Sequence, residues 1–178
     1  SVTKIGYSAF DHCTSLKAFY GKFASEDNRC LIVNGTLCSF AIGRGATSYT
    51  IPDSVTKIGE WAFSYCTSLT SVTIPDSVTE IEDSAFSGCT SLTSVTIGNG
   101  VTSIGSYAFI SCSSLASVYC KPTTPPSLGE DAFKWFDDGS WNEVNIGCTI
   151  YVPTASVEAY KSAEYWRDYE DHIVGYEF

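Results

Sequence analysis

The chain has 178 residues, of which 44% are apolar, and a formal net charge of -10 at pH 7. This length and apolar content suffice to bury one substantial core, so we expect a single elongated domain over residues 1–178. The acidic charge argues against nucleic acid and acidic membrane surfaces as partners, and no apolar run reaches the ~18 residues of a membrane span. Because the chain opens at Ser1 inside a repeat, we expect a trimmed fragment whose targeting segment is missing.

The first residues, Val2–Leu16 (VTKIGYSAFDHCTSL), introduce a pattern that returns three times. The three later copies span residues 55–77, 78–100 and 101–123, with a period of 23 residues (78 minus 55, and 101 minus 78). A fixed period in this range is typical of a solenoid. Because one copy cannot bury its apolar stripe alone, neighbouring copies must cover it.

A longer coil over residues 21–54 follows the first repeat, residues 1–20. Its Asn34-Gly35 pair lies between two β-favouring runs and predicts a hairpin with a two-residue type I′ turn. With this turn, Leu31 faces Cys38 across the hairpin.

Each regular copy predicts a strand, a turn, a second short strand and a helical turn. At the end of the copy 55–77, Val72 and Ile74 point inward from an alternating strand. Pro75-Asp76 favours a turn, and Val78–Ile81 a second extended piece. Asp83–Cys89 suits a single helical or 3₁₀ turn.

Residues 124–178 are less regular and predict an irregular last coil followed by a cap. Thr149–Pro153 (TIYVP) is expected to be the last strand, and Thr154 the N-cap of a helix that extends through Ala163. From Gly129 to Phe178 there are eleven acidic residues against three basic ones. Such an atypical polar unit would cover the open end of a solenoid.

Four cysteines occupy one slot of the repeat, and we expect them to be reduced and buried. Stacked coils would place them ~4.8 Å apart with parallel Cβ directions, whereas a disulfide needs directions that converge. No cysteine or histidine spacing fits a zinc site. The stacked cysteines are Cys13, Cys66, Cys89 and Cys112, and the sequence leaves the redox state of Cys30, Cys38, Cys120 and Cys148 open.

The repeated pattern VTxIGxxAFxxCxSLxSVxIP resembles the leucine-rich repeats of the BspA-like class of bacterial surface proteins. The segments GKFASEDNRCLIVNGTL and IYVPTASVEAYKSAEYW are also similar to recurring parts of such proteins. The resemblance implies a leucine-rich-repeat solenoid: a right-handed superhelix of β-strands and 3₁₀ turns, with a parallel sheet on its concave side and a C-terminal capping helix. It also implies export to the cell surface and, for some members, adhesion to host matrix proteins, with no catalytic residue. Ser77 stands where the commoner repeat pattern has asparagine.

The outward rows of the main predicted sheet are the candidate binding surface. Serine and threonine suit a solvated strand face, which is the simpler interpretation. The alternative is an uncharged platform with a tyrosine at each end, suited to a protein or glycan partner. Trp61, Trp135 and Trp141 would add a stacking surface, although Trp135 and Trp141 are expected to pack the irregular last coil instead. The candidate ligand-binding residues are Tyr20, Ser71, Thr73, Ser94, Thr96, Ser117 and Tyr119.

Four other motifs have simpler explanations than a site. Asp11-His12-Cys13 contains the residue types of a nucleophilic triad, but neighbours in sequence point in different directions. Asp137–Ser140 offers oxygen atoms without the spacing of a calcium loop. Asn34-Gly35-Thr36 fits the N-glycosylation pattern, although the turn explains it, and His172 is expected at the surface or in the cap.

The sequence thus predicts a non-enzymatic cell-surface interaction or adhesion module, a fragment of a larger exported bacterial protein, with no metal or cofactor. The alternatives are a carbohydrate-binding module and a structural spacer that displays other domains. Expected partners are host matrix or other extracellular proteins, or glycans. The first coil has no preceding neighbour in this chain, so Val2, Ile5, Ala9 and Phe10 should be only partly covered. We therefore expect weak self-association through the N-terminal coil.

Overall fold

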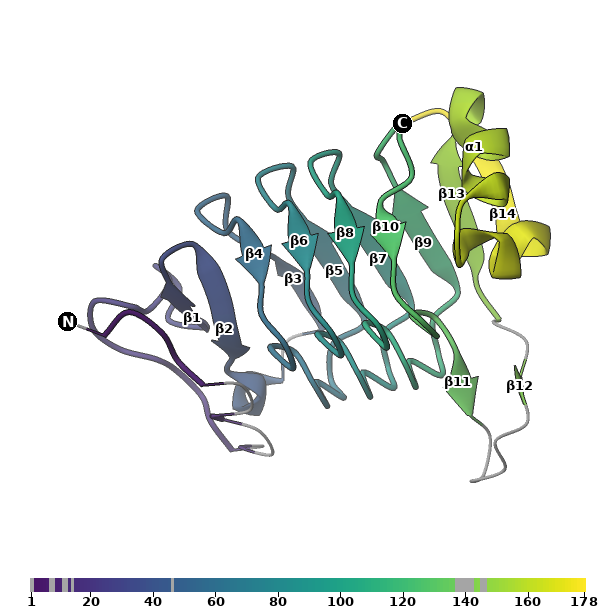
Figure 1. Ribbon diagram of the computed structural model, residues 1–178. Coiled ribbons are helices and arrows are strands. Elements are labelled where there is room, and N and C mark those ends of the chain that lie inside the picture. Colours follow the sequence, from purple (N-terminus) through teal and green to yellow (C-terminus); the bar gives the residue numbers. More distant parts are fainter. Residues whose placement is uncertain are drawn as a thin grey trace.

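The structure, a computed structural model, describes residues 2–6, 9–10, 13, 15–45, 47–136, 143–144 and 147–178. The chain winds into stacked coils that bury one core between two sheets of six strands each (Figure 1). The main sheet has the order β14-β13-β9-β7-β5-β3, and the second sheet has the order β1-β2-β4-β6-β8-β10. This is the leucine-rich-repeat solenoid that the sequence predicts.

The strands of the two sheets alternate along the regular coils. Those of the main sheet are β3 (Ser48–Thr50), β5 (Ser71–Ile74), β7 (Ser94–Ile97), β9 (Ser117–Cys120), β13 (Thr149–Pro153) and β14 (Ile173–Tyr176). Those of the second sheet are β1 (Cys30–Val33), β2 (Thr36–Phe40), β4 (Lys57–Ile58), β6 (Glu80–Ile81), β8 (Ser103–Ile104) and β10 (Ser127–Leu128). A separate antiparallel pair joins β11 (Trp135–Phe136) to β12 (Glu143–Val144).

The strand register confirms the 23-residue period. In the main sheet, Val72 pairs with Val95, and Val95 pairs with Val118, in parallel strands. In the second sheet, Ile58 pairs with Ile81 and Ile81 with Ile104. The inward residues of both sheets are buried, because consecutive side chains of a strand alternate between core and solvent.

Each regular slot of the repeat forms a column through the core. The phenylalanine rings of successive coils stack nearly in parallel, with 4.7 Å between the ring centroids of Phe63 and Phe86 and 4.9 Å between those of Phe86 and Phe109. Threonine and serine hydroxyls join the coils at the edges of the strands. Thr79 donates to the carbonyl oxygen of Thr56 at 3.2 Å. Ser77, at the position of the usual asparagine, donates to the carbonyl oxygen of Val55 at 2.8 Å.

The predicted helical or 3₁₀ turn over Asp83–Cys89 does not form a helix: these residues make successive turns, in which the N–H of Ser87, for example, donates to the carbonyl oxygen of Ser84 at 3.0 Å. Ser84 and Gly88 have positive φ values of 55° and 71°, which a right-handed helix does not allow. Alternate backbone amides, those of Ser84, Phe86 and Gly88, donate to the next coil. The N–H of Phe86, for example, donates to the carbonyl oxygen of Ala108 at 2.7 Å. This third set of coil-to-coil hydrogen bonds replaces those of a helix.

The predicted hairpin is present, with one change in register. Asn34 and Gly35 have φ values of 51° and 78°, as a type I′ turn requires. Leu31 pairs with Ser39, not with Cys38, because β2 contains a bulge. The bulge is needed because Leu37 and Phe40, three residues apart, both point into the core. A regular strand would place them on opposite faces.

The first repeat does not form a regular coil. None of the described residues between 2 and 20 belongs to a strand, and β2 lies beside β4 in the place of the preceding short strand. Backbone groups of this segment pair with the long coil, since Leu16 accepts from the N–H of Gly43 at 2.7 Å. Cys13 is exposed, so the expectation that it is buried with the other stacked cysteines is wrong. The expected partial exposure of Val2, Ile5, Ala9 and Phe10 is confirmed.

The C-terminal cap contains more elements than the sequence predicts. The strand at 149–153 has the predicted bounds but is followed by β14, which pairs with it in parallel. Thr154 does not cap a helix through its side chain; it begins the 3₁₀ turn η2 (Thr154–Ser156), which leads into α1 (Val157–Ser162). The other 3₁₀ segments are η1 (Ile42–Arg44) and η3 (Trp166–His172). In the described part of the chain, no helix has the length and apolarity to cross a membrane.

The cap closes the end of the core with large aromatic side chains. The Trp166 indole N–H donates to the carbonyl oxygen of Pro126 at 2.7 Å, and the Tyr160 hydroxyl donates to that of Pro122 at 2.8 Å. The ring centroids of Phe133 and Trp166 lie 6.0 Å apart. The last ring of the stacked phenylalanines is thereby covered.

Candidate interaction surface

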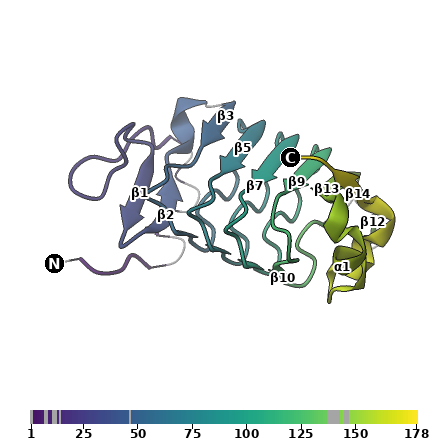
Figure 2. The same ribbon diagram turned by 90° about the horizontal axis from the view of Figure 1, so that it is seen from above.

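The outward side chains of the main sheet form two rows that cross the strands in register. One row contains Ser71, Ser94 and Ser117, and the other contains Thr73, Thr96 and Tyr119. In Figure 2 these strands lie side by side along one edge of the solenoid. The structure therefore brings together six of the predicted site residues, on a surface without charged side chains in these rows. Whether they bind a ligand remains a prediction.

Tyr20, the seventh predicted residue, does not belong to this surface. The main sheet ends at β3, and Tyr20 lies outside both sheets with 80% of its surface exposed. The amide of its neighbour Phe19 bonds to the carbonyl oxygen of Asn28 at 2.8 Å, which holds this segment against the long coil. The predicted platform with a tyrosine at each end is therefore wrong at its N-terminal end.

The C-terminal end of the sheet is more aromatic than the sequence predicts. Tyr119 stacks on Tyr151 with 4.8 Å between ring centroids and 11° between ring planes. Tyr176 packs edge-on against both, at 5.5 Å from each. Phe178 packs on Tyr176 at 5.1 Å. We call these four residues, Tyr119, Tyr151, Tyr176 and Phe178, the aromatic cluster.

Sequence reasoning missed three of the four because they lie outside the 23-residue period. Tyr151 is 32 residues from Tyr119 (151 minus 119) but pairs with it directly, since the coil between β9 and β13 is longer. The alternation within Thr149–Pro153 was a usable signal, because it places Tyr151 on the outward face. Tyr176 had no such signal, since β14 was not predicted.

Trp61, one of the three tryptophans of the predicted stacking surface, does not lie on the main sheet. Trp61 lies in a turn between the second sheet and β5, is half-buried, and donates its indole N–H to Glu60 at 2.9 Å. It has a positive φ of 60°. Trp141 and the side chain of Trp135 lie outside the described residues.

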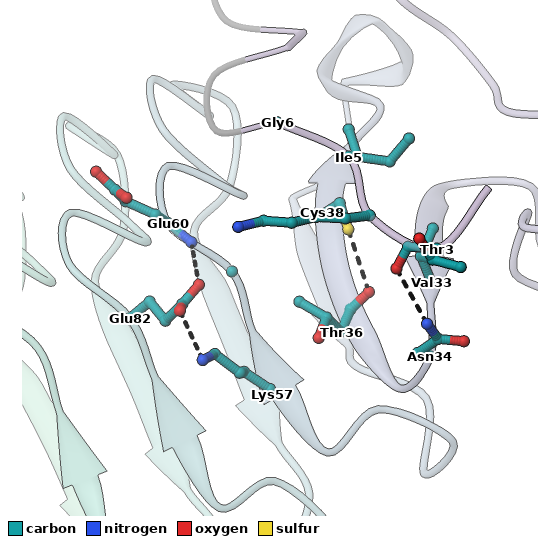
Figure 3. A pocket seen from close by; sticks show the side chains of 12 residues that line it. Thr3, Ile5, Gly6, Val33, Asn34, Thr36, Cys38, Lys57, Glu60 and Glu82 are labelled. Carbon is teal, nitrogen blue, oxygen red and sulfur yellow. Dashed lines mark hydrogen bonds and ion pairs between the residues drawn. The ribbon is translucent and has the colours of Figure 1, made fainter.

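A hollow of about 240 Å³ lies on the other side of the molecule, between residues 3–6 and strands β2 and β4 (Figure 3). Two of its charged groups, Lys57 and Glu82, are paired: the Lys57 ammonium lies 2.6 Å from Glu82 and also 3.1 Å from Glu80. The hydrogen bond with Glu82 raises the pKa of Lys57. Small-molecule sites are usually larger, at ~300–1,000 Å³. Since these ions are already paired, the hollow is a weaker candidate than the aromatic cluster.

The buried cysteines serve packing. All eight cysteines are free thiols, and the Sγ of Cys89 donates to the carbonyl oxygen of Phe63 at 3.1 Å. Cys112 repeats this contact with Phe86 at 3.2 Å. Burial raises the pKa of Cys120 and of Cys148 to about 12, so these thiols stay protonated at neutral pH.

The remaining motifs give no assembled site in the described residues. Asp11, His12 and Asp137–Ser140 lie outside them. Asn34 is in the turn, and its side-chain amide donates to the carbonyl oxygen of Thr3 at 3.0 Å. His172 is half-buried at the end of η3. Within the part of the chain that is described, no group of three histidine, cysteine or acidic side chains is placed to hold a metal ion.

Comparison with known proteins identifies the repeat. A model of the BspA type leucine rich repeat region matches residues 39–154 in six copies. A leucine-rich repeat protein from Eubacterium ventriosum is 26% identical with a TM-score of 0.56, over 85% of this chain and 38% of that one. A leucine rich cell surface protein from Faecalibacterium prausnitzii is 26% identical with a TM-score of 0.56, over 88% of this chain and 41% of that one.

A third structure, the leucine-rich repeat protein of T. pallidum, is 27% identical with a TM-score of 0.53, over 66% of this chain and 56% of that one. The chain thus spans between 38% and 56% of the length of these three proteins. No curated protein matches the sequence.

Proposed function

The chain belongs to the family of BspA-type leucine-rich-repeat proteins, and from this premise we propose that it is a non-enzymatic adhesion module exposed at a bacterial cell surface. Repeats of this family are protein-interaction modules. One of the similar structures is a leucine rich cell surface protein, which supports the proposed location. The proposed partner is a host matrix protein or another extracellular protein.

The observation that carries the proposal is the aromatic cluster. Tyr176 is 42% and Phe178 52% exposed, so the cluster presents apolar area to solvent. Tyrosine is enriched at protein interfaces because one end of its side chain is apolar and the other can form hydrogen bonds. The ordered rows of serine and threonine beside the cluster extend this surface. They lose little entropy on binding because their strands are already fixed.

The ring geometry favours a protein over a glycan. Sugar rings stack on exposed faces of aromatic rings, whereas Tyr119 and Tyr151 turn one face toward each other. In the strand register, their row continues to Thr96 on one side and Val174 on the other. The stacked pair therefore presents ring edges and hydroxyl groups outward. Such edges suit a protein surface, and the carbohydrate-binding module becomes the second candidate.

The test is a binding screen of the immobilised chain against host matrix proteins and a glycan array. The double variant Tyr119→Ala and Tyr151→Ala should weaken binding of any protein ligand at least about tenfold, as the loss of a central interface anchor does. The matched control is Tyr65→Ala with Tyr107→Ala, two exposed tyrosines in turns away from the main sheet.

Two results would contradict the proposal. Loss of binding in the control variant but not in the cluster variant would place the contact on another face. The absence of any saturable ligand in the screen would favour the structural spacer. Thermal unfolding of each variant, measured alongside, separates loss of contact from loss of fold.

A further inference from the structure

The last strand of the main sheet, β14, has an open edge. The sheet order places β14 at one end, where it pairs in parallel with β13. No strand among the described residues pairs with its other edge. Val174, Gly175 and Tyr176 are all exposed. An open edge of this kind presents backbone N–H and C=O groups to which a further strand can bind.

The cap packs against β14 through α1 and η2, but Val174, Gly175 and Tyr176 of this strand stay exposed. In Figure 2, β13 and β14 continue the row of β5, β7 and β9, and α1 lies to one side of them. The largest cap side chains point inward, since Tyr160 and Trp166 are fully buried. The helices therefore cover the end of the core, and β14 extends the sheet beyond it.

Side chains next to this edge suit a basic partner. Tyr176 and Phe178 form an exposed aromatic pair with 5.1 Å between their centroids. Lysine and arginine bind the faces of such rings. A strand placed beside β14 would bring alternate side chains next to Val174 and Tyr176, because the outward rows continue in register across the sheet.

The charge around the β14 edge also favours a basic partner. Residues 164–178 contain five acidic side chains, all exposed, against one arginine. Glu177 lies directly between the two exposed rings in the chain. A surface of this sign attracts cationic segments and repels acidic ones.

We propose that the β14 edge binds an extended, lysine- or arginine-rich segment of a partner protein as an additional strand of the main sheet. This inference rests on the proposed function, since the aromatic cluster flanks the same edge. Backbone hydrogen bonds from β14 supply the affinity, and the rings with Glu177 select the basic side chains.

The probe is a short fluorescein-labelled peptide of alternating lysine and valine, followed by fluorescence anisotropy. It should bind at least about tenfold more tightly than the matching glutamate–valine peptide, and salt should weaken it, as expected for exposed charges. Two further peptides carry N-methyl groups on alternate backbone amides: one peptide on the odd-numbered residues, and the other on the even-numbered residues. Only the set that faces β14 should lose binding, because a strand directs alternate amides toward its neighbour.

Protein variants complete the test. Tyr176→Ala and Glu177→Lys should each weaken binding of the lysine peptide by about tenfold, while Tyr65→Ala, an exposed tyrosine in a distant turn, should not. Equal effects of the two N-methyl sets, or no effect of either, overturn strand addition. If Tyr176→Ala abolishes peptide binding and Glu177→Lys has no effect, the basic side chains are not selected as we propose. This result overturns the inference but leaves the proposed function intact. If the chain alone forms dimers and Glu177→Lys dissociates them, a second copy of the chain occupies the β14 edge. This result also overturns the proposal of a basic partner segment.

Discussion

The segments 2–16 and 55–69 have almost the same sequence but different structures. They differ at four of fifteen positions. Phe63 and Cys66 are buried, at 0% and 3% exposure, and belong to the stacked columns. Phe10 is half-buried and Cys13 is exposed, although they occupy the same slots.

The difference shows that the conformation of a repeat depends on its neighbours. Residues 55–69 lie between β2 on one side and the next coil on the other, so strands and turns on both sides accept their hydrogen bonds. The described residues of 2–16 lie beside the irregular hairpin coil, where the carbonyl oxygen of Leu16 accepts from the N–H of Gly43. A single copy of the pattern cannot repay the entropy of its own ordering, so it forms regular structure only between partners.

The largest expected contrast comes from the phenylalanine slot. Phe86→Ala should lower the free energy of unfolding by ~3–5 kcal/mol, the usual cost of removing a buried ring. Phe86 is fully buried and stacks on rings from both neighbouring coils. Phe10→Ala should cost only about 1 kcal/mol, because half-exposed groups lose less buried area. Urea unfolding followed by circular dichroism measures both, and equal costs would mean that the first repeat is packed like the others.

Alkaline pH should destabilise the coils with buried thiols. Burial raises the pKa of Cys120 to about 12 from its ordinary value of 9.0. The folded state therefore keeps a proton that the unfolded chain releases above about pH 9. The stabilisation is complete below that pH and is lost as the pH rises toward 12, at ~1.4 kcal/mol per pH unit for each such thiol.

Unfolding free energies at pH 7, 9 and 10 under reducing conditions measure this slope. Cys120→Ala should reduce this slope, because it removes one thiol whose pKa burial raises. A slope that Cys120→Ala leaves unchanged would contradict the prediction.

The smallest contrast concerns the threonine that follows the first valine of each repeat. In the regular coils, the Thr79 hydroxyl donates to the carbonyl oxygen of Thr56. Thr79→Val should cost ~0.5–1 kcal/mol, the net worth of one hydrogen bond. Thr3→Val, in the same slot of the first repeat, should cost nothing measurable, because Thr3 is exposed and its hydroxyl makes no hydrogen bond to a described residue. Urea unfolding of the two variants tests this, and a loss at Thr3 equal to that at Thr79 would contradict it.

Much of the fold could be predicted from the sequence, because the repeat period shows which positions are equivalent in successive coils and the alternation shows which of them face the core. The inward positions Val72, Val95 and Val118, the turn at Asn34-Gly35 and the strand at 149–153 all follow from local alternation or turn chemistry. The serine and threonine rows of the candidate surface follow from the same alternation. These features depend on residues close in sequence or on an exact period, so a single sequence contains them.

The tertiary structure alone decided the features that break the period. The segment 83–89 forms turns and no helix, because alternate amides bond to the next coil. Cys13 is exposed because the hairpin coil supplies no matching neighbour. The aromatic cluster joins Tyr119, Tyr151 and Tyr176, which are spaced irregularly along the chain but meet where the cap adds two strands to the sheet. The periodic sequence thus determined which residues of the regular coils enter the core, and contacts between residues far apart in the sequence determined where the cap presents its aromatic surface.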